Sequence, residues 1–269
     1  MVERPAVRNL RLVLEYDGAG FSGWQRQGRG RTVEGELRLA LAGLLSAEPT
    51  VHAAGRTDAG AHAEGQVVNF HYQGRLAPAR LAAALNARLP ADLALLAADE
   101  VPPGFHARYS ARARRYRYRY LDRPVRPVLD RGRCWHVRRR LDVPAMAAAA
   151  AALVGEHDWT TFCAASEPAA SRVREMRVAR AERRDRFVEL DLVGEGFLRG
   201  LVRSLAGALA EVGLRRRPPS WVGELLLARD RRLAPRTAPA AGLTLVAVQY
   251  DAETEAALTA SAAADTFRA

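Results

Sequence analysis

A strict alternation of arginine and tyrosine over residues 115–120 restricts the possible folds more than any other feature of the sequence. In an extended strand, successive side chains point to opposite faces of a sheet. The three tyrosines therefore share one face, and the three arginines share the other. The pattern predicts an antiparallel strand with its tyrosine face on a core or a slot and its arginine face outward.

Other segments show either the same period of two or the spacing of an amphipathic helix. Further strands are expected at 10–16, 51–54, 68–72, 93–97, 187–193 and 243–250. Helices are expected at 33–45, 78–89, 144–154, 197–212 and 221–227, the first with Thr32 as N-cap. Because both halves mix strands and helices, we expect two α+β subdomains that share a sheet, 1–104 and 105–250. A weakly structured tail, 251–269, is expected to follow.

Charge indicates the class of partner. The 269 residues include 41 basic and 30 acidic ones, which give a formal net charge of +11 and a sequence pI near 10.7. This surplus favours a polyanionic partner, with nucleic acid ahead of a membrane surface. All basic residues are arginine, because the chain contains no lysine. The missing lysine excludes Schiff-base and pyridoxal-phosphate enzymes and the lysine of a Walker or kinase site.

Cysteine and histidine predict neither a disulfide framework nor a metal site. Cys134 and Cys163 are too few for either, and the six histidines show no metal-ligand spacing. The N-terminus lacks an apolar signal core, and the longest apolar run, 145–154, is far shorter than the roughly 20 residues of a membrane span. We therefore expect a cytoplasmic protein with no metal site and no membrane segment.

Arginine and aromatic residues are interleaved over residues 105–140, which contain 13 arginines and only two acids. Arginine binds phosphate through two parallel hydrogen bonds, and aromatic faces stack on bases. Each tyrosine taken singly is expected to pack in the core. The cluster as a whole favours nucleic-acid contact, because so many like charges repel one another without a counter-charge. The predicted RNA-binding residues are Arg26, Arg114, Arg115 and Arg117.

Residues 18–23 fit the G-x-G-x-x-G pattern of a dinucleotide-binding fold, directly after a strand. That fold requires a helix that starts at the motif. Here the expected helix starts only after Thr32, and no second strand ends in an acidic residue about 20 positions on. We therefore interpret the motif as a glycine-rich turn.

The polar loop 55–65 (GRTDAGAHAEG) is the main candidate for chemistry. Small residues on both sides of Asp58 would let another backbone or an extruded nucleotide approach its carboxylate closely. Arg56 is placed to anchor a phosphate or to keep Asp58 ionised, as a nucleophile must be. The alternative is an aspartate that caps its own turn.

Several blocks of the sequence, taken together, resemble the tRNA pseudouridine synthase A family. The blocks are 16–27 (YDGAGFSGWQRQ), 54–70 (AGRTDAGAHAEGQVVNF), 105–118 (FHARYSARARRYRY), 197–213 (FLRGLVRSLAGALAEVG) and the closing 242–250 (GLTLVAVQY). They occur in the family's order and span nearly the whole chain, so the resemblance is specific.

The resemblance implies a fold and a reaction. The fold is an α+β pseudouridine synthase fold, in which two ferredoxin-like or RNA-recognition-like subdomains share a central, mostly antiparallel sheet flanked by helices. The reaction converts uridine to pseudouridine at positions 38, 39 and 40 in the anticodon stem and loop of tRNA. It needs no cofactor or metal, and it is carried out by a homodimer whose two clefts bind tRNA across subunits.

The resemblance also assigns roles to single residues. Asp58 is the nucleophile, and Arg203 pairs with it. Tyr116 lies against the target uracil, and Arg56 contacts the backbone near the flipped base. Without the resemblance, Arg203 would be interpreted as solvated, because it lies off the apolar stripe of its helix. His62 is interpreted as structural or RNA-contacting, not as a general base.

The chain departs from the family at one point. Many members carry His-His-Met or His-Gln where this chain has Arg199, Gly200 and Leu201, which affects the detail of tRNA contact there and not the chemistry. A non-catalytic RNA-binding protein is the alternative function. It predicts surface aromatic residues on its strands instead of a carboxylate in a glycine-flanked loop. A dinucleotide oxidoreductase is disfavoured by the late helix start.

Overall fold

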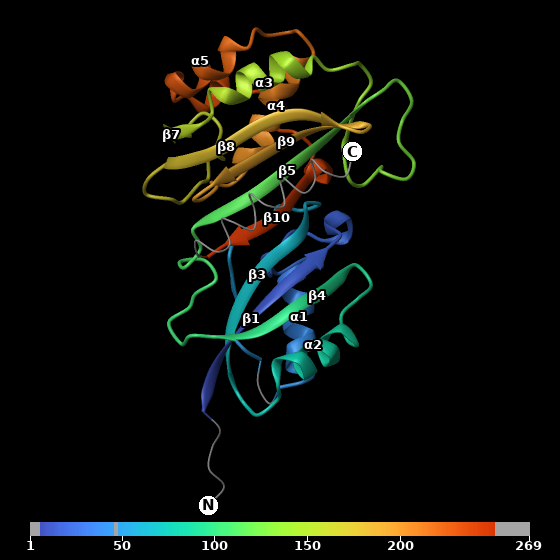
Figure 1. The fold of residues 1–269 in the computed structure, drawn as a ribbon, viewed down its shortest axis with the longest axis vertical. Coiled ribbons are helices and arrows are strands. Elements are labelled where there is room, and N and C mark those ends of the chain that lie inside the picture. The colour runs from blue at the N-terminus through green and yellow to red at the C-terminus, as the bar shows by residue number, and fades with distance from the viewer. Residues whose placement is uncertain (1–5, 46–47, 251–269) are drawn as a thin grey trace, which may run out of the picture.

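The computed structural model describes residues 6–45 and 48–250, and these form one continuous sheet with helices packed against it (Figure 1). The strands are β1 (Val7–Tyr16), β2 (His52–Ala53), β3 (His62–Gln73), β4 (Leu93–Val101), β5 (Ala113–Asp122), β6 (Trp135–Val137), β7 (Gly155–Asp158), β8 (Val173–Arg184), β9 (Phe187–Gly194) and β10 (Leu243–Gln249). The helices are α1 (Val33–Ala42), α2 (Pro78–Asn86), α3 (Val143–Ala151), α4 (Leu201–Gly213) and α5 (Ser220–Ala228). The expected tail, 251–269, lies outside the described residues.

The sheet runs in the order β4-β1-β3-β10-β5-β9-β8-β7, with β2 paired to β3 and β6 paired to β5. Its pairs are antiparallel except β10 with β3 and β5 with β6. The last strand in the sequence, β10, lies between β3 and β5 and so joins the two halves of the chain (Figure 1). The expected α+β fold with a shared, mostly antiparallel sheet is confirmed. The division at residue 104 stays a prediction.

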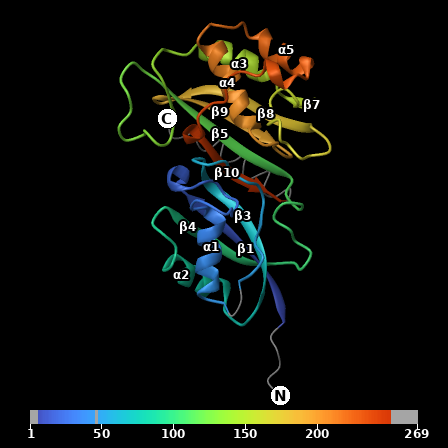
Figure 2. The same cartoon turned by 180° about the vertical axis from the view of Figure 1, so that it is seen from behind.

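Two helices cover the same face of the sheet, one on each half. Turning the molecule by 180° brings α1 and α4 from behind the strands to the front (Figures 1 and 2). Leu37 and Leu41 of α1, and Leu205 and Leu209 of α4, are fully buried, as expected for apolar residues four positions apart on a helix. The candidate site lies where the two halves meet, at the loop before β3 and the start of α4.

The alternating strand is β5, and its tyrosine face packs in the core as predicted. Tyr118 and Tyr120 are fully buried, and Tyr116 is 6% exposed. The hydroxyl of Tyr120 donates to the carbonyl oxygen of Ala206 in α4 at 2.8 Å, so the tyrosine face is the face that α4 covers. Burial raises the pKa of Tyr118 and Tyr120, which keeps both phenols protonated as donors.

Element boundaries agree with the sequence where caps are clear and differ where they are not. Thr32 Oγ1 accepts a hydrogen bond from the N–H of Gly35, which confirms the predicted N-cap of α1. The last long helix begins at Leu201 instead of residue 197, because Gly200 takes a φ of +75° and interrupts the helical backbone. Strand β8 was not predicted, because its charged sequence has no apolar face to produce a period of two.

Candidate active site

Asp58 lies in a tight loop that connects β2 to β3. The N–H of Ala61 donates to the carbonyl oxygen of Asp58 at 3.1 Å and closes the turn, and Gly60 within it has a φ of +80°. The Asp58 side chain is 27% exposed. Within residues 6–45 and 48–250, its carboxylate makes no hydrogen bond to its own turn, so the alternative of a turn-capping aspartate is wrong.

Arg203, in the first turn of α4, pairs with Asp58 in the other half of the molecule. Its Nη1 lies 2.8 Å from Asp58 Oδ2, and its Nε donates to the carbonyl oxygen of Ala238 at 2.8 Å. The N–H of Ala238 donates back to the carbonyl oxygen of Arg203 at 3.0 Å. The guanidinium is therefore fixed on one edge and offers its other edge to the carboxylate of Asp58.

Tyr116 of β5 reaches the same loop from the core. A Cβ added to Gly55 would lie 3.4 Å from the Tyr116 hydroxyl, so the phenol ends against the start of the loop. Its ring packs edge-on against Phe197, with centroids 4.8 Å apart. Burial raises the pKa of Tyr116 to about 12, with the charge of Asp58 adding to the effect and Arg114 opposing it. The phenol is therefore neutral at physiological pH.

A second layer of side chains holds the loop from behind, and the sequence did not reveal it. The hydroxyl of buried Tyr16 lies 2.8 Å from Thr57 Oγ1, and Gln66 Nε2 donates to the carbonyl oxygen of Gly55 at 2.7 Å. The N–H of Trp24 donates to the carbonyl oxygen of Thr57 at 3.1 Å. The loop is thus fixed on both sides of Gly55 and Thr57, which positions Asp58. A sequence signal for these contacts lies in Tyr16-Asp17-Gly18, which leads into the glycine-rich turn and contains the tyrosine that holds Thr57.

The glycine-rich turn 18–23 packs directly on the aspartate loop. A Cβ added to Gly23 would lie 2.9 Å from the carbonyl oxygen of Thr57 and 3.1 Å from the amide nitrogen of Ala59. Gly23 also has a φ of +93°. The motif forms a single 3-10 turn, Gly18–Gly20, and the first α-helix, α1, begins only at Val33. The glycines therefore serve close backbone approach, and the dinucleotide interpretation stays rejected.

His62 lies at the base of the loop and links it to a distant segment. The N–H of Gly18 donates to His62 Nδ1 at 3.0 Å, and His62 Nε2 lies 2.8 Å from the carbonyl oxygen of Gly132. The residue is 6% exposed. These contacts support a structural role for His62.

Arg26 and Arg56 lie at the surface. The backbone N–H of Arg26 donates to buried Glu34 at 2.8 Å, and its guanidinium pairs with Glu48 at 2.9 Å. Arg56 is exposed, and its side chain forms no hydrogen bond or ion pair to any residue that the structure describes. Both arginines can meet an incoming phosphate, and Arg56 can do so without breaking a contact.

Arg115 and Arg117 lie on the opposite face of β5 from Tyr116, away from Asp58. Arg115 Nη2 is 3.0 Å from Asp191 Oδ1, and Arg117 Nε is 3.2 Å from Glu189 Oε2. The expectation that this cluster has no counter-charge is therefore wrong, because strand β9 supplies one. With side chains only 12% exposed, these two arginines are held by the protein itself, which disfavours the predicted RNA contact.

Arg114 is also occupied by the protein. Its guanidinium donates to the backbone carbonyl oxygens of Ala54, Arg108, Ala111 and Glu195 at 2.6 to 3.4 Å. Burial lowers the pKa of Arg114, and the residue is 8% exposed. The structure thus points to a positioning role for Arg114, which ties the segment before Asp58 to the start of β5, instead of the predicted phosphate contact.

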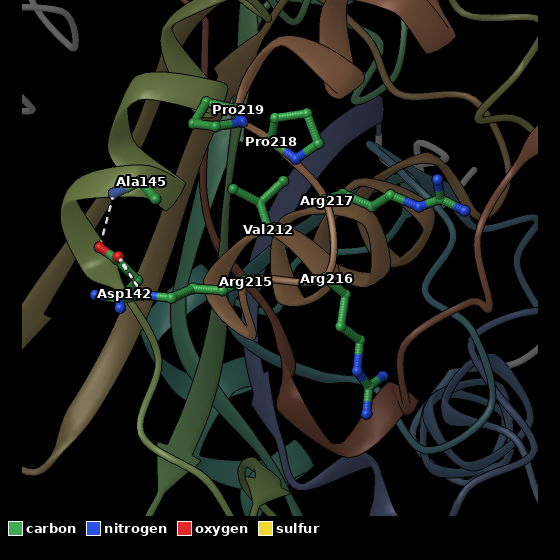
Figure 3. Close-up of a pocket in the computed structure, with 8 residues that line it drawn as sticks. All are labelled: Asp142, Ala145, Val212, Arg215, Arg216, Arg217, Pro218 and Pro219. Carbon is green, nitrogen blue, oxygen red and sulfur yellow. Dashed lines mark hydrogen bonds and ion pairs between the residues drawn. The ribbon is translucent and has the colours of Figure 1, made fainter.

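A cavity of about 370 Å³ lies at the far end of α4 from Arg203 (Figure 3). It is lined by Asp142, Ala145, Val212, Arg215, Arg216, Arg217, Pro218 and Pro219. Its arginines are each engaged, in the contacts Arg215–Asp142, Arg216–Glu211 and Arg217–Trp221. Val212 follows Arg203 by nine residues, about 13 Å along a helix, so the cavity is separate from the Asp58 site.

Two kinds of feature are absent from the described part of the chain. No group of three or more His, Cys, Asp or Glu side chains there is arranged to hold a metal ion. No helix there is long and apolar enough to cross a membrane.

Comparisons with known proteins identify close relatives. A family model described as tRNA pseudouridine synthase matches residues 12–110 and 149–251. A tRNA pseudouridine synthase A from Moorella thermoacetica is 46% identical over 243 residues, which cover 90% of this chain and 99% of that protein. The proteins of the same name from Citrobacter koseri and Escherichia coli O1:K1 are 41% and 42% identical over 249 residues. These cover 93% and 92% of this chain, and 92% of each relative.

Proposed function

The chain belongs to the tRNA pseudouridine synthase family, and from this premise we propose that it modifies uridines 38, 39 and 40 in the anticodon stem and loop. Family membership makes it an isomerase that forms pseudouridine in tRNA, with the pseudouridine synthase fold, as the sequence led us to expect. The choice of positions and the residue roles below are our proposal.

Asp58 is the proposed nucleophile, and its pairing with Arg203 is the observation that carries the proposal. The guanidinium 2.8 Å away orients the carboxylate, while 27% exposure leaves it open to a substrate. Isomerisation breaks the bond from ribose C1′ to uracil N1 and forms one from C1′ to C5. N1 gains a proton and C5 loses one, so no atoms are gained or lost. Asp58 is placed either to attack C1′ or to assist formation of a glycal.

Tyr116 is the proposed contact of the target uracil. A base that is detached and then rejoined through carbon must be held after its first bond breaks, and a stacked ring in a closed slot does this. The position of the Tyr116 hydroxyl at Gly55 supports the assignment, because it brings the ring to the start of the aspartate loop.

Exposed arginines are the proposed phosphate contacts. The uridine must leave the helical stack, which costs roughly a few kcal/mol. Arg56, beside Asp58 and without a protein partner among the described residues, is suited to hold the backbone of the flipped nucleotide. Arg26 is the second such contact. Bidentate contacts of this kind offset the cost of extrusion.

We also propose a cytoplasmic homodimer that needs no cofactor, which is the arrangement that the sequence resemblance implies. Light scattering coupled to size-exclusion chromatography tests the dimer. A single peak of monomer mass at all accessible concentrations contradicts it.

Mapping pseudouridine in unmodified tRNA after incubation with the purified chain tests the reaction. We expect conversion at positions 38, 39 and 40, and none with Asp58→Ala, while tRNA binding survives the substitution. Normal turnover by Asp58→Ala rejects the nucleophile. Binding of tRNA by the unaltered chain without any conversion supports the alternative of a passive RNA-binding protein.

A further inference from the structure

Three aromatic rings stack in series where β2 meets the segment before β5. His52 and His106 have ring centroids 4.7 Å apart at an interplanar angle of 38°, and His106 and Tyr109 have centroids 4.4 Å apart at 34°. His106 is thus the middle ring. Tyr109 ends the series at the solvent and is 76% exposed. We call His52, His106 and Tyr109 the aromatic stack.

The backbone that carries the aromatic stack is held by buried polar groups. The N–H of Ala107 donates to Asn69 Oδ1 at 2.9 Å, and its carbonyl oxygen accepts from the Tyr250 hydroxyl at 2.7 Å. The carbonyl oxygen of Arg108 accepts from Arg114 at 2.6 Å. An exposed ring on so fixed a backbone is preorganised, so a ligand that stacks on it has little ordering entropy to overcome.

The middle ring is fixed and uncharged. His106 Nδ1 accepts from the N–H of Arg108 at 3.1 Å, and the N–H of His106 donates to Ser110 Oγ at 3.0 Å. Burial lowers the pKa of His106, and the neighbouring His52 and Arg108 lower it further. The ring is therefore neutral at physiological pH and extends the aromatic surface beneath Tyr109.

The aromatic stack lies about 20 Å from the Asp58 loop, because His52 pairs with Asn69, seven residues along β3 from His62, and it lies among exposed positive charges. His52 precedes Asp58 by six residues, a span of at most about 21 Å even for extended chain. Arg56 lies between them and is exposed. The guanidinium carbon of exposed Arg108 is 5.7 Å from the centroid of the Tyr109 ring. A flat ring flanked by guanidinium groups fits an unpaired base and its phosphates.

We propose that the aromatic stack is a platform for one unpaired base of the tRNA, several nucleotides away from the one that enters the Asp58 site. This inference rests on the proposed function, because it takes the substrate to be an RNA with a flipped uridine. Base–aromatic stacking tolerates any base, since every base has a π-face. The stack therefore holds the RNA at a second point, away from the target, without restricting the sequence there.

Binding of fluorescently labelled tRNA, measured by anisotropy in an Asp58→Ala background, tests the platform without turnover. Adding Tyr109→Ala is expected to weaken binding about five- to a hundredfold, the range for loss of one base–aromatic stack. Adding Tyr109→Phe, which keeps the ring, is expected to change binding less than about twofold. The matched control is Leu227→Ala on α5, which removes another large exposed side chain (84% exposed) and is expected to have no effect.

Anticodon stem-loop RNAs that each carry one abasic nucleotide then locate the partner base. At one position of the RNA, the abasic nucleotide is expected to remove the difference in affinity between the Tyr109→Ala variant and its Asp58→Ala parent. The proposal is overturned if Tyr109→Ala binds as tightly as its parent, if Tyr109→Phe loses as much, or if the loss persists on duplex RNA without unpaired bases. Failure of the proposed function is distinct: tRNA binding would remain while the chain with Asp58 intact makes no pseudouridine.

Discussion

Arg203 Nη1 and Asp58 Oδ2 lie 2.8 Å apart although 145 residues separate them in the sequence. One comes from the start of α4 and the other from the loop before β3, so the pair forms only when both halves share the sheet. The carbonyl oxygen of Ala238 orients the guanidinium. The proposed nucleophile and its counter-charge are thus a property of the whole fold.

Substitution of Arg203 tests this pair. Arg203→Ala is expected to lower kcat about a hundredfold, because a fixed charged donor is lost from the reacting centre. Arg203→Lys is expected to restore only part of the loss, because a lysine has no fork to reach Asp58 and Ala238 together. Arg199→Ala, in the exposed segment before α4, is the control and should leave kcat unchanged. An unaltered kcat in Arg203→Ala would show that the pair is not needed for turnover.

Close backbone approach at Gly23 gives a second prediction. Gly23→Ala forces a Cβ to 2.9 Å from the Thr57 carbonyl oxygen at a φ of +93°, so we expect displacement of the aspartate loop and a large loss of turnover. Gly28→Ala is the matched control, since an added Cβ there has no heavy atom within 4 Å. Steady-state kinetics and thermal melts of both variants make the comparison. Equal activity of the two would refute the role of close approach.

The hydroxyl of Tyr116 makes no hydrogen bond to a residue in the described ranges, which leaves it for the substrate. Tyr116→Phe is expected to lower kcat about a hundredfold with little change in KM, the scale of a lost proton-transfer group. Tyr116→Leu is expected to raise KM as well, because the ring is lost. If Tyr116→Phe turns over normally, the ring alone carries the function.

Salt dependence separates surface arginines from those held by the protein. Arg56→Gln is expected to reduce the slope of log affinity for tRNA against log salt by about one, the effect of one lost phosphate contact. Arg117→Gln should leave the slope unchanged, because that guanidinium is already paired with Glu189. A flat salt response of the unaltered chain, or equal effects of the two variants, would contradict phosphate anchoring by Arg56.

Stability should depend on pH through Asp122. Its burial opposes ionisation, but hydrogen bonds from Arg183 and the Leu141 N–H, with the charge of Arg140, outweigh it and lower the pKa of Asp122. Its stabilising effect is therefore present above the ordinary aspartate pKa of about 3.9 and is lost as pH falls through the lower folded value.

Urea unfolding of Asp122→Asn at several pH values measures the effect. We expect a loss of about 3 kcal/mol in the free energy of unfolding at pH 7, as for one partner removed from a buried pair. The difference from the unaltered chain should shrink below about pH 4. Asp99→Asn, which breaks the partly exposed pair with Arg11, should cost less than about 1 kcal/mol. A loss at pH 7 that does not diminish in acid would contradict the assignment.

Local sequence patterns predicted those helices and strands whose formation depends on residues close together in the sequence. The Thr32 cap and the buried face of β5 follow from spacing alone. Strand β8 escaped prediction because few of its residues are buried, with Met176 and Ala181 the fully covered ones. It is held by pairing with β9, which leaves no periodic signal in its own sequence.

The candidate site was predictable only in part, for a related reason. The glycine-flanked Asp58 stands out in sequence, whereas helical periodicity places Arg203 off an apolar stripe without showing what lies opposite. The counter-charges of Arg115 and Arg117 come from β9, some 75 residues away in the sequence. The sequence around the two arginines therefore shows an excess of positive charge that the folded protein does not have at that place. Contacts between distant segments decide which arginines remain free for RNA.

The central place of β10 has a consequence for biosynthesis. The N-terminal half emerges from the ribosome first, and domains tend to fold in that order. The strand that joins the halves, and Ala238 just before it, emerge only after residue 238 of 269 has been translated. A polypeptide that stops before residue 238 therefore lacks both the carbonyl group that orients Arg203 and the strand that joins the two halves.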